Sequence, residues 1–200
     1  MPALLMIAAA AAQLTAPQPR EAFITLEDYP AKALSRHQHG AVIFNLVTDP
    51  RGKPLKCTVE SIKETDFGAL VCKKAMRARF EPATNGNGAP VHGVFRSVMN
   101  FWLPDERGSD NYPYVATPDL AVTVQGGTAG EVKLAVLFDE RSKPVDCVPD
   151  AGEKAVAQSK VACDFLLRQW SGAPLKGTED LSVPHVRNMK IAFVPERAPR

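Results

Sequence analysis

The sequence has few of the residues and patterns on which recognisable enzymes and nucleic-acid-binding proteins depend. Aromatic residues make up 7% of the 200 residues, no basic run interleaves with them, and the formal net charge is only +2. Because nucleic-acid recognition needs clustered Lys and Arg, this balance argues against nucleic acid as the main partner. There is no Gly-x-Ser-x-Gly, no Gly-rich phosphate loop and no His-Glu-x-x-His. We therefore expect a non-enzymatic protein without a cofactor, and an enzyme with an unrecognised site is the least favoured class.

Metal-binding patterns are equally scarce. No Cys-x-x-Cys occurs, and no His stands at the spacing of a zinc finger. His37 and His39 come closest to a ligand pair, but they fall in a predicted loop without Asp, Glu or Cys at a suitable spacing. We expect solvated histidines here and no metal site.

The only long apolar run is at the N-terminus. Residues 3–12 are unbroken apolar sequence, and no charged side chain appears before Arg20. The run is shorter than the roughly 20 residues that span a bilayer, and Ala10-Ala11-Ala12 has the small residues of a secretory cleavage site. We expect residues 1–12 to be a signal peptide cleaved near Ala12, so that the protein is exported and contacts a membrane only if the segment stays uncleaved.

What the chain does contain is an internal repeat. The pattern Asp-x-Arg-x-Lys-Pro-x-x-Cys occupies residues 49–57 and returns 90 residues later at residues 139–147. Further matches follow at a shift of one residue: Cys72 with Cys163, Arg77 with Arg168, and Arg96 with Arg187. A tandem duplication explains these matches better than chance. We expect two units, residues 21–104 and 119–196, joined by a polar, turn-rich linker over residues 105–118.

The repeat also narrows the pairing of the four cysteines. Each copy carries two, and in an exported protein such cysteines are expected to form disulfides. Pairing within each copy, Cys57 with Cys72 and Cys147 with Cys163, is the economical choice. Each bridge would close a loop of about 15 residues and contribute about 3 kcal/mol in the chain-entropy model. A unit of roughly 80 residues gains from such a staple, because it buries little core.

Hydrophobic periodicity predicts the same order of elements in both units. In the first unit we predict a short helix at 31–34, strands at 41–47 and 55–59, a helix at 67–78 and a long strand at 90–103. In the second unit we predict strands at 132–138, 144–148 and 183–194 and a helix at 153–170, with a poorly preserved opening helix. Residues 13–24 are interpreted as a leader in which Pro17 and Pro19 block regular structure. The fold class is α+β: each unit is a small antiparallel sheet with one helix packed across it.

The first unit resembles the TonB C-terminal domain family. The features that carry the resemblance are Tyr29-Pro30, Gly40-Ala41-Val42, Asp49-Pro50-Arg51-Gly52 and Arg79-Phe80-Glu81-Pro82, in this order along residues 26–104. The second unit is similar to the same family more faintly. It keeps Gly130-Glu131-Val132 and the turn at Asp139, but it lacks the Tyr-Pro pair and the Pro after Trp170.

The resemblance implies a periplasmic protein that grips a short peptide segment, such as one from an outer-membrane receptor, by strand addition. In this family the final strand provides the sheet edge, and the stretch around Tyr-Pro lies close by. The residues that this implies for peptide binding are Leu26, Glu27, Asp28, Tyr29, Pro30, Val94, Phe95, Arg96, Val98, Asn100 and Trp102. The corresponding second edge would be residues 185–193.

Three features differ from an energy transducer of this family. The N-terminal apolar run is short and has no polar residue for a motor complex, no Pro-rich spacer follows it, and the domain is doubled. We therefore expect the fold and peptide binding, with a link to TonB-dependent transport, rather than energy transduction itself.

An alternative is a structural or scaffold module of the cell envelope. The final strands of both units are apolar on both sides, and uncovered hydrophobic edges invite aggregation. They could instead pair with each other and join the units into one sheet. Lys73, Lys74, Arg77 and Arg79 are interpreted as a solvated helix face, with a patch for acidic partners as the minority interpretation.

Overall fold

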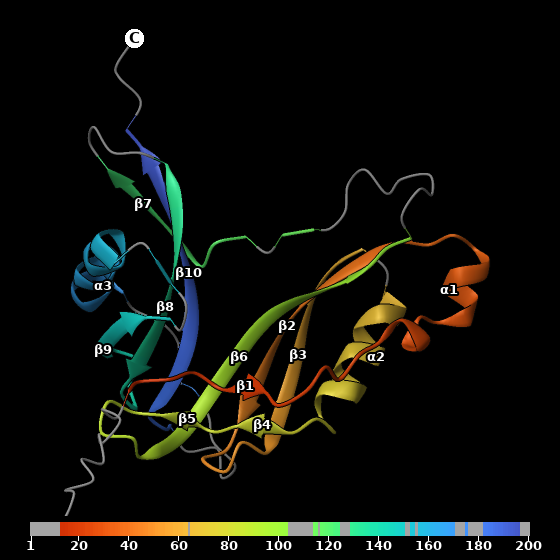
Figure 1. Cartoon of the computed structure of the whole chain (residues 1–200), viewed down its shortest axis with the longest axis horizontal. Helices are drawn as coiled ribbons and strands as arrows, with labels where there is room; N and C mark the ends of the chain where they lie inside the picture. The colour runs from red at the N-terminus through yellow and green to blue at the C-terminus, as the bar shows by residue number, and fades with distance from the viewer. Residues whose placement is uncertain are drawn as a thin grey trace, which may run out of the picture.

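The computed structural model describes residues 13–63, 65–103, 114–115, 117–124, 129–150, 153–154, 156–170, 175 and 182–196. The predicted signal peptide and residues 105–113 and 116 of the predicted linker lie outside the described residues. The described chain is α+β, as predicted, with one large sheet and a helix against each half of it (Figure 1). No helix within these ranges has the length and apolar character that a membrane crossing requires.

The first half of the chain contains the elements expected from its periodicity, together with three very short strands. Its elements are β1 (Gln18–Pro19), the 3-10 helix η1 (Leu26–Asp28), α1 (Ala31–Ser35), β2 (Gly40–Thr48), β3 (Pro54–Lys63), α2 (Thr65–Ala75), β4 (Phe80–Glu81), β5 (Ala83–Thr84) and β6 (Pro90–Phe101). The second half contains β7 (Leu120–Val124), β8 (Gly130–Phe138), β9 (Pro144–Pro149), α3 (Val156–Gln169) and β10 (His185–Pro195). The order strand, turn, strand, helix, long strand therefore occurs twice.

The repeated sequence pattern forms the same turn in both halves. The Asp49 Oδ1 atom accepts hydrogen bonds from the backbone N–H groups of Arg51 and Lys53, at 2.8 and 2.9 Å. Asp139 Oδ1 accepts from Arg141 and Lys143 at 2.9 and 2.8 Å. A short Asp side chain that closes a turn on its own backbone is an Asx turn. The spacing that both copies of the pattern share is therefore a structural requirement of the hairpin.

Gly52 fits this turn because it has no side chain. Its φ is 77°, and a Cβ atom there would lie 2.3 Å from the carbonyl oxygen of Phe80. The turn is thus pressed directly against the backbone that follows α2. A left-handed conformation alone costs a residue with a Cβ about 1–2 kcal/mol.

We expect Gly52→Ala to lower the free energy of unfolding by about 2 kcal/mol, because conformational strain and the clash with Phe80 act together. Gly88→Ala is the matched control. Gly88 has a φ of 76° in an exposed turn, so that it carries only the conformational strain. Urea denaturation of both variants measures the difference. Equal losses would show that the contact with Phe80 does not constrain the turn.

Eight strands form one sheet in the order β3-β2-β6-β10-β8-β9, with β5 on β6 and β7 on β10. The two halves meet where the final strands β6 and β10 pair in parallel, through the residue pairs His92–His185, Gly93–Val186 and Val94–Arg187. The alternative prediction, that the final strands of the two units pair with each other, is confirmed over this short stretch. Beyond it, β6 and β10 run apart (Figure 1).

Each half has its own hydrophobic core. In the first, α2 packs on β2 and β3, and buries Phe67, Val71 and Ala75 against Val42, Phe44 and Leu46. In the second, α3 packs on β8 and β9, and buries Ala162 and Leu166 among residues of β8 and β10. Two structural units each need a core of their own, and two separate cores are present. The predicted boundaries of the units, residues 21–104 and 119–196, stay a prediction.

A third, smaller cluster fills the seam between the halves, and the N-terminal segment contributes to it. Leu14 and Ala16, each 4% exposed, pack with Ala83, Ala135 and Val186. The interpretation of residues 13–24 as a leader without regular structure was therefore wrong.

Instead, β1 pairs with β4, and the backbones of Thr15 and Thr84 exchange two hydrogen bonds of 3.0 Å (Figure 1). Pro17 and Pro19 are tolerated because this is a very short edge pairing. Burial of Leu14 and Ala16 outweighs the tendency of Pro17 and Pro19 to prevent regular structure.

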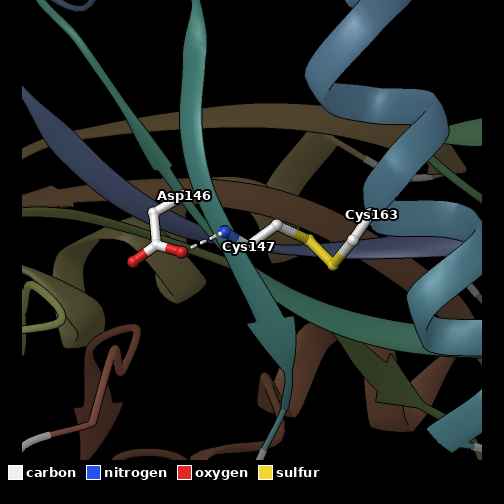
Figure 2. Close-up of a disulfide and its surroundings, with 3 residues drawn as sticks. All are labelled: Asp146, Cys147 and Cys163. Atoms are coloured by element: carbon white, nitrogen blue, oxygen red, sulfur yellow. Dashed lines mark hydrogen bonds between the residues drawn. A yellow bond between two sulfur atoms is a disulfide. The ribbon is translucent and has the colours of Figure 1, made fainter.

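Both predicted disulfides are present. Cys57 on β3 is bonded to Cys72 on α2, and Cys147 on β9 is bonded to Cys163 on α3, each with 5.6 Å between the Cα atoms. Figure 2 shows the second bridge, where the sulfur atoms join strand to helix and Asp146 Oδ1 accepts a hydrogen bond of 2.8 Å from the N–H of Cys147. Each helix is thus tied covalently to the strand beneath it.

Candidate functional site: the open edge of β6

The long strand β6 is paired unequally on its two edges. One edge pairs with β2 from Gly93 to Phe101. The other edge pairs with β10 only from His92 to Val94. Among the described residues, no strand pairs with this second edge over residues 95–101. An edge of this kind is where a further strand can pair.

The sequence-predicted residues on β6 fall on both sides of this boundary. Val94 is 6% exposed and has β-sheet partners on both edges, Val47 and Arg187. Phe95, Arg96, Val98 and Asn100 lie beyond the β10 pairing, on the stretch with the open edge, and all four are partly exposed. Trp102 follows the end of β6 and is also partly exposed.

Side chains on this stretch already hold a passing segment by its backbone. The Asn100 Nδ2 atom donates to the carbonyl of Tyr114 at 3.0 Å, and the N–H of Tyr114 donates to Asn100 Oδ1 at 2.7 Å. Arg96 donates to the carbonyl of Thr117 at 3.2 Å. An amide side chain that satisfies both the N–H and the C=O of one residue reproduces the two-bond contact that a neighbouring strand would make.

An ion cluster closes the point where β6 and β10 separate. The Arg187 guanidinium lies 2.5 Å from Asp119 Oδ1, and that of Arg96 lies 4.0 Å from the same atom. Asp119 Oδ2 also accepts the N–H of Lys190 at 2.9 Å. Arg96 and Arg187 are matched positions of the sequence repeat, so equivalent arginines from the two final strands converge on one carboxylate. The Asp119 side chain is only 8% exposed, which strengthens both interactions relative to a surface ion pair.

A cavity of about 320 Å³ lies at this separation point. It is bordered on the β6 side by Phe95, Ser97 and Val98, and on the β10 side by Asn188 and Lys190, with Asp119 between them. Apolar and polar groups therefore both line it. Such a lining suits an extended segment with side chains on both faces better than a small rigid ligand.

The stretch around Tyr29 lies at the far end of β6. The Tyr29 ring makes edge contacts with Phe67 and Phe101, with ring centroids 5.7 and 5.9 Å apart, and its hydroxyl donates to the carbonyl of Gln38 at 2.5 Å. Asp28 forms an ion pair with Lys74, which holds the pKa of Asp28 below its usual value. These contacts anchor the stretch to α2 and to Phe101, the last residue of β6.

The remaining predicted residues of this stretch are also placed. Leu26 is 90% exposed and Glu27 in η1 is also exposed, while Pro30 immediately precedes α1. The two predicted binding stretches therefore meet only at the C-terminal end of β6. There the aromatic packing of Tyr29 gives it a clear structural role.

The corresponding edge of the second half is closed. β10 pairs with β8 along residues 185–193, and its other edge pairs with β6 and then, in parallel, with β7 from Ile191 to Pro195. Between these two pairings, the backbone of Lys190 is bonded to Asp119, whose N–H donates to its carbonyl at 2.8 Å. β7 was not predicted from the sequence, because alternation over Leu120–Val124 is too short to identify a strand without its partner.

No group of three or more His, Cys, Asp or Glu side chains that could hold a metal ion occurs within the described ranges. A comparison with curated proteins found no match.

A comparison with protein families, in contrast, gave a match over residues 26–103 to the family described as Gram-negative bacterial TonB protein C-terminal. The matched segment begins at η1, ends two residues after β6 and therefore contains the open edge; it does not include the second half. Residues 26–103 of this chain thus belong to the TonB C-terminal domain family.

Proposed function

We propose that this chain binds an extended peptide or protein segment in the periplasm, by adding it as a strand to β6 beyond Val94. The TonB C-terminal domain is a periplasmic domain of Gram-negative bacteria that acts with protein partners in outer-membrane transport. The two disulfides fit an exported protein, because such bonds persist in oxidising compartments. Binding, rather than catalysis, is the activity that these features favour.

The observation that carries the proposal is the unequal pairing of β6. Along residues 95–101, β6 is paired with β2 on one edge, and no strand among the described residues pairs with its other edge, so this second edge offers hydrogen bonds to an extended chain. The contacts of Asn100 with Tyr114 and of Arg96 with Thr117 support this, because they already recognise main chain without regard to side chain. Affinity would come from the backbone and selectivity from the lining of the cavity.

A structural role in the envelope is the second candidate, and the pairing of the final strands favours it. β10 has partners along both edges, and β6 shares three residue pairs with it. In that case the halves complete each other, and residues 95–101 would be covered by the chain's own segment around Tyr114.

The two candidates predict different NMR results. With synthetic peptides from the periplasmic faces of outer-membrane receptors, binding is expected to shift the backbone amides of residues 95–101. Hydrogen exchange is expected to slow at those amides that face away from β2. The amides of residues 191–193 serve as the internal control, since they already lie between β7 and β8. If the amides of residues 95–101 that face away from β2 are protected before any peptide is added, and no peptide shifts them, the structural role is the correct one.

A further inference from the structure

A second cavity, remote from the open edge, has cationic side chains as half of its lining residues. It has a volume of about 440 Å³ and lies where the turn before β3 meets the end of α2. Arg20, Arg51, Lys53, Arg77 and Arg79 border it. We refer to it as the basic cavity. The whole chain has a net charge of only +2, so this concentration of cations is a local feature.

Three chain segments bring these cations together, and the backbone fixes each of them. Gly52 lies so close to Phe80 that no Cβ fits between the turn and the segment after α2. The N–H of Arg20 donates to the carbonyl of Arg79 at 2.9 Å, which holds the N-terminal segment beside them. The Asp49 carboxylate binds the backbone of Arg51 and Lys53 and so orients the turn. The position of the cavity is therefore fixed by these backbone contacts, although its charged side chains are exposed to solvent.

The charges in the basic cavity are mostly uncompensated. Arg20 has an acidic partner, Glu81, with 3.0 Å between Nε and Oε1. Within the part of the chain that the structure describes, Arg51, Lys53, Arg77 and Arg79 form no ion pair. Cations at a helix C-terminus interact favourably with the helix dipole, which accounts for Arg77 and Arg79. The dipole gives no reason for Arg51 and Lys53, which belong to a different segment and face the same space.

We propose that the basic cavity binds a phosphate monoester group. Guanidinium groups pair with phosphate through two parallel hydrogen bonds, and Lys adds a point charge. A carboxylate would neutralise one of the four unpaired cations. A phosphate monoester carries a charge of about −1.5 to −2 near neutral pH and offers three acceptor oxygens, so it matches the site better. The group could belong to a lipid headgroup or to a soluble phosphorylated compound, since both present the same chemistry.

The second half of the chain supplies a natural control. Arg141, Lys143 and Arg168 hold the repeat positions of Arg51, Lys53 and Arg77. However, the residue two positions after Arg168 is Trp170, whereas the residue two positions after Arg77 is Arg79. Basic residues at a turn and at a helix end are therefore present in both halves. The basic cavity also requires the positive charges of Arg20 and Arg79, which belong to the first half.

The test is a titration of the full chain with inorganic phosphate, followed by NMR at constant ionic strength held with chloride. We expect saturable shifts of the backbone amides of residues 51–53 and 76–80. The double variant Arg51→Gln/Arg79→Gln is expected to weaken binding at least about tenfold, because each charge-assisted hydrogen bond accounts for about one order of magnitude in Kd. The double variant Arg141→Gln/Lys143→Gln should bind like the wild type.

Sedimentation with phosphatidylcholine vesicles, with and without phosphatidic acid, distinguishes the sources. Binding that requires phosphatidic acid and is lost in Arg51→Gln/Arg79→Gln identifies a lipid headgroup. Binding of inorganic phosphate without binding to these vesicles identifies a soluble phosphomonoester. Absence of a saturable shift with inorganic phosphate, or equal weakening in the two double variants, overturns the proposal. None of these outcomes depends on peptide binding at β6.

Discussion

Acidification from pH 7 to pH 4.5 is expected to lower the free energy of unfolding by about 2 to 3 kcal/mol through His185 alone. His185 lies at the start of β10, is 5% exposed and stacks on Phe138 with 5.1 Å between the ring centroids. Burial lowers its pKa from 6.5 to about 4, with smaller contributions in the same direction from the charges of Arg187 and His92. Its Nδ1 atom lies 3.2 Å from the carbonyl of Val183.

The sign follows from the lowered pKa. The unfolded chain takes up a proton on His185 near pH 6.5, whereas the folded chain resists it until about pH 4. Stability from the neutral, buried ring is therefore fully present above about pH 6.5 and is lost as the pH falls towards 4. His92, the partner of His185 across the β6–β10 pairing, also has a pKa lowered by burial, so that acid acts on both sides of the seam.

Urea denaturation at a series of pH values measures this loss, and His185→Gln isolates it. The Gln variant keeps a polar side chain and removes the titrating group, so its stability should fall by about 2 to 3 kcal/mol less than that of the wild type between pH 7 and pH 4.5. His92→Gln is the comparison variant, because His92 is partly exposed whereas His185 is buried. Parallel pH profiles of wild type and His185→Gln would mean that His185 does not control the acid response.

The seam that His185 occupies is also where sequence reasoning reached its limit. Within each half, periodicity identified β2, α2, β8 and α3, because each has a long enough apolar pattern facing one core. The Asp49 and Asp139 turns were predictable for the same local reason. Between the halves, nothing in the chain specifies that β6 and β10 pair in parallel over three residues and then separate. That geometry depends on how two cores pack, which no short window of sequence records.

The same distinction applies to the candidate site. Phe95, Arg96, Val98 and Asn100 were assigned from the family resemblance, and they lie on the part of β6 whose second edge has no strand partner among the described residues. The closure of β10 by β7 could not be assigned in this way. β7 is five residues long and is stabilised by its parallel partner rather than by its own sequence. As a result, two strands that are equivalent in the repeat have different edges available.

Removal of either disulfide is expected to lower the free energy of unfolding by about 3 kcal/mol, because each bond closes a loop of similar length in the unfolded chain. The separations are 15 residues for Cys57–Cys72 and 16 residues for Cys147–Cys163. The double variants Cys57→Ala/Cys72→Ala and Cys147→Ala/Cys163→Ala avoid free thiols and should lose nearly equal global stability.

The local consequences should differ between the halves. On α2, Lys74 is also held by Asp28 and Phe67 by Tyr29, so the segment of residues 26–30 continues to fix this helix after its disulfide is removed. The second half has no counterpart of that segment among the described residues, and α3 is held through Ala162, Cys163 and Leu166. Hydrogen exchange should therefore accelerate more along α3 in Cys147→Ala/Cys163→Ala than along α2 in Cys57→Ala/Cys72→Ala. Equal acceleration in the two variants would show that residues 26–30 do not secure α2. A stability loss below about 1 kcal/mol in either variant would contradict the loop-closure argument.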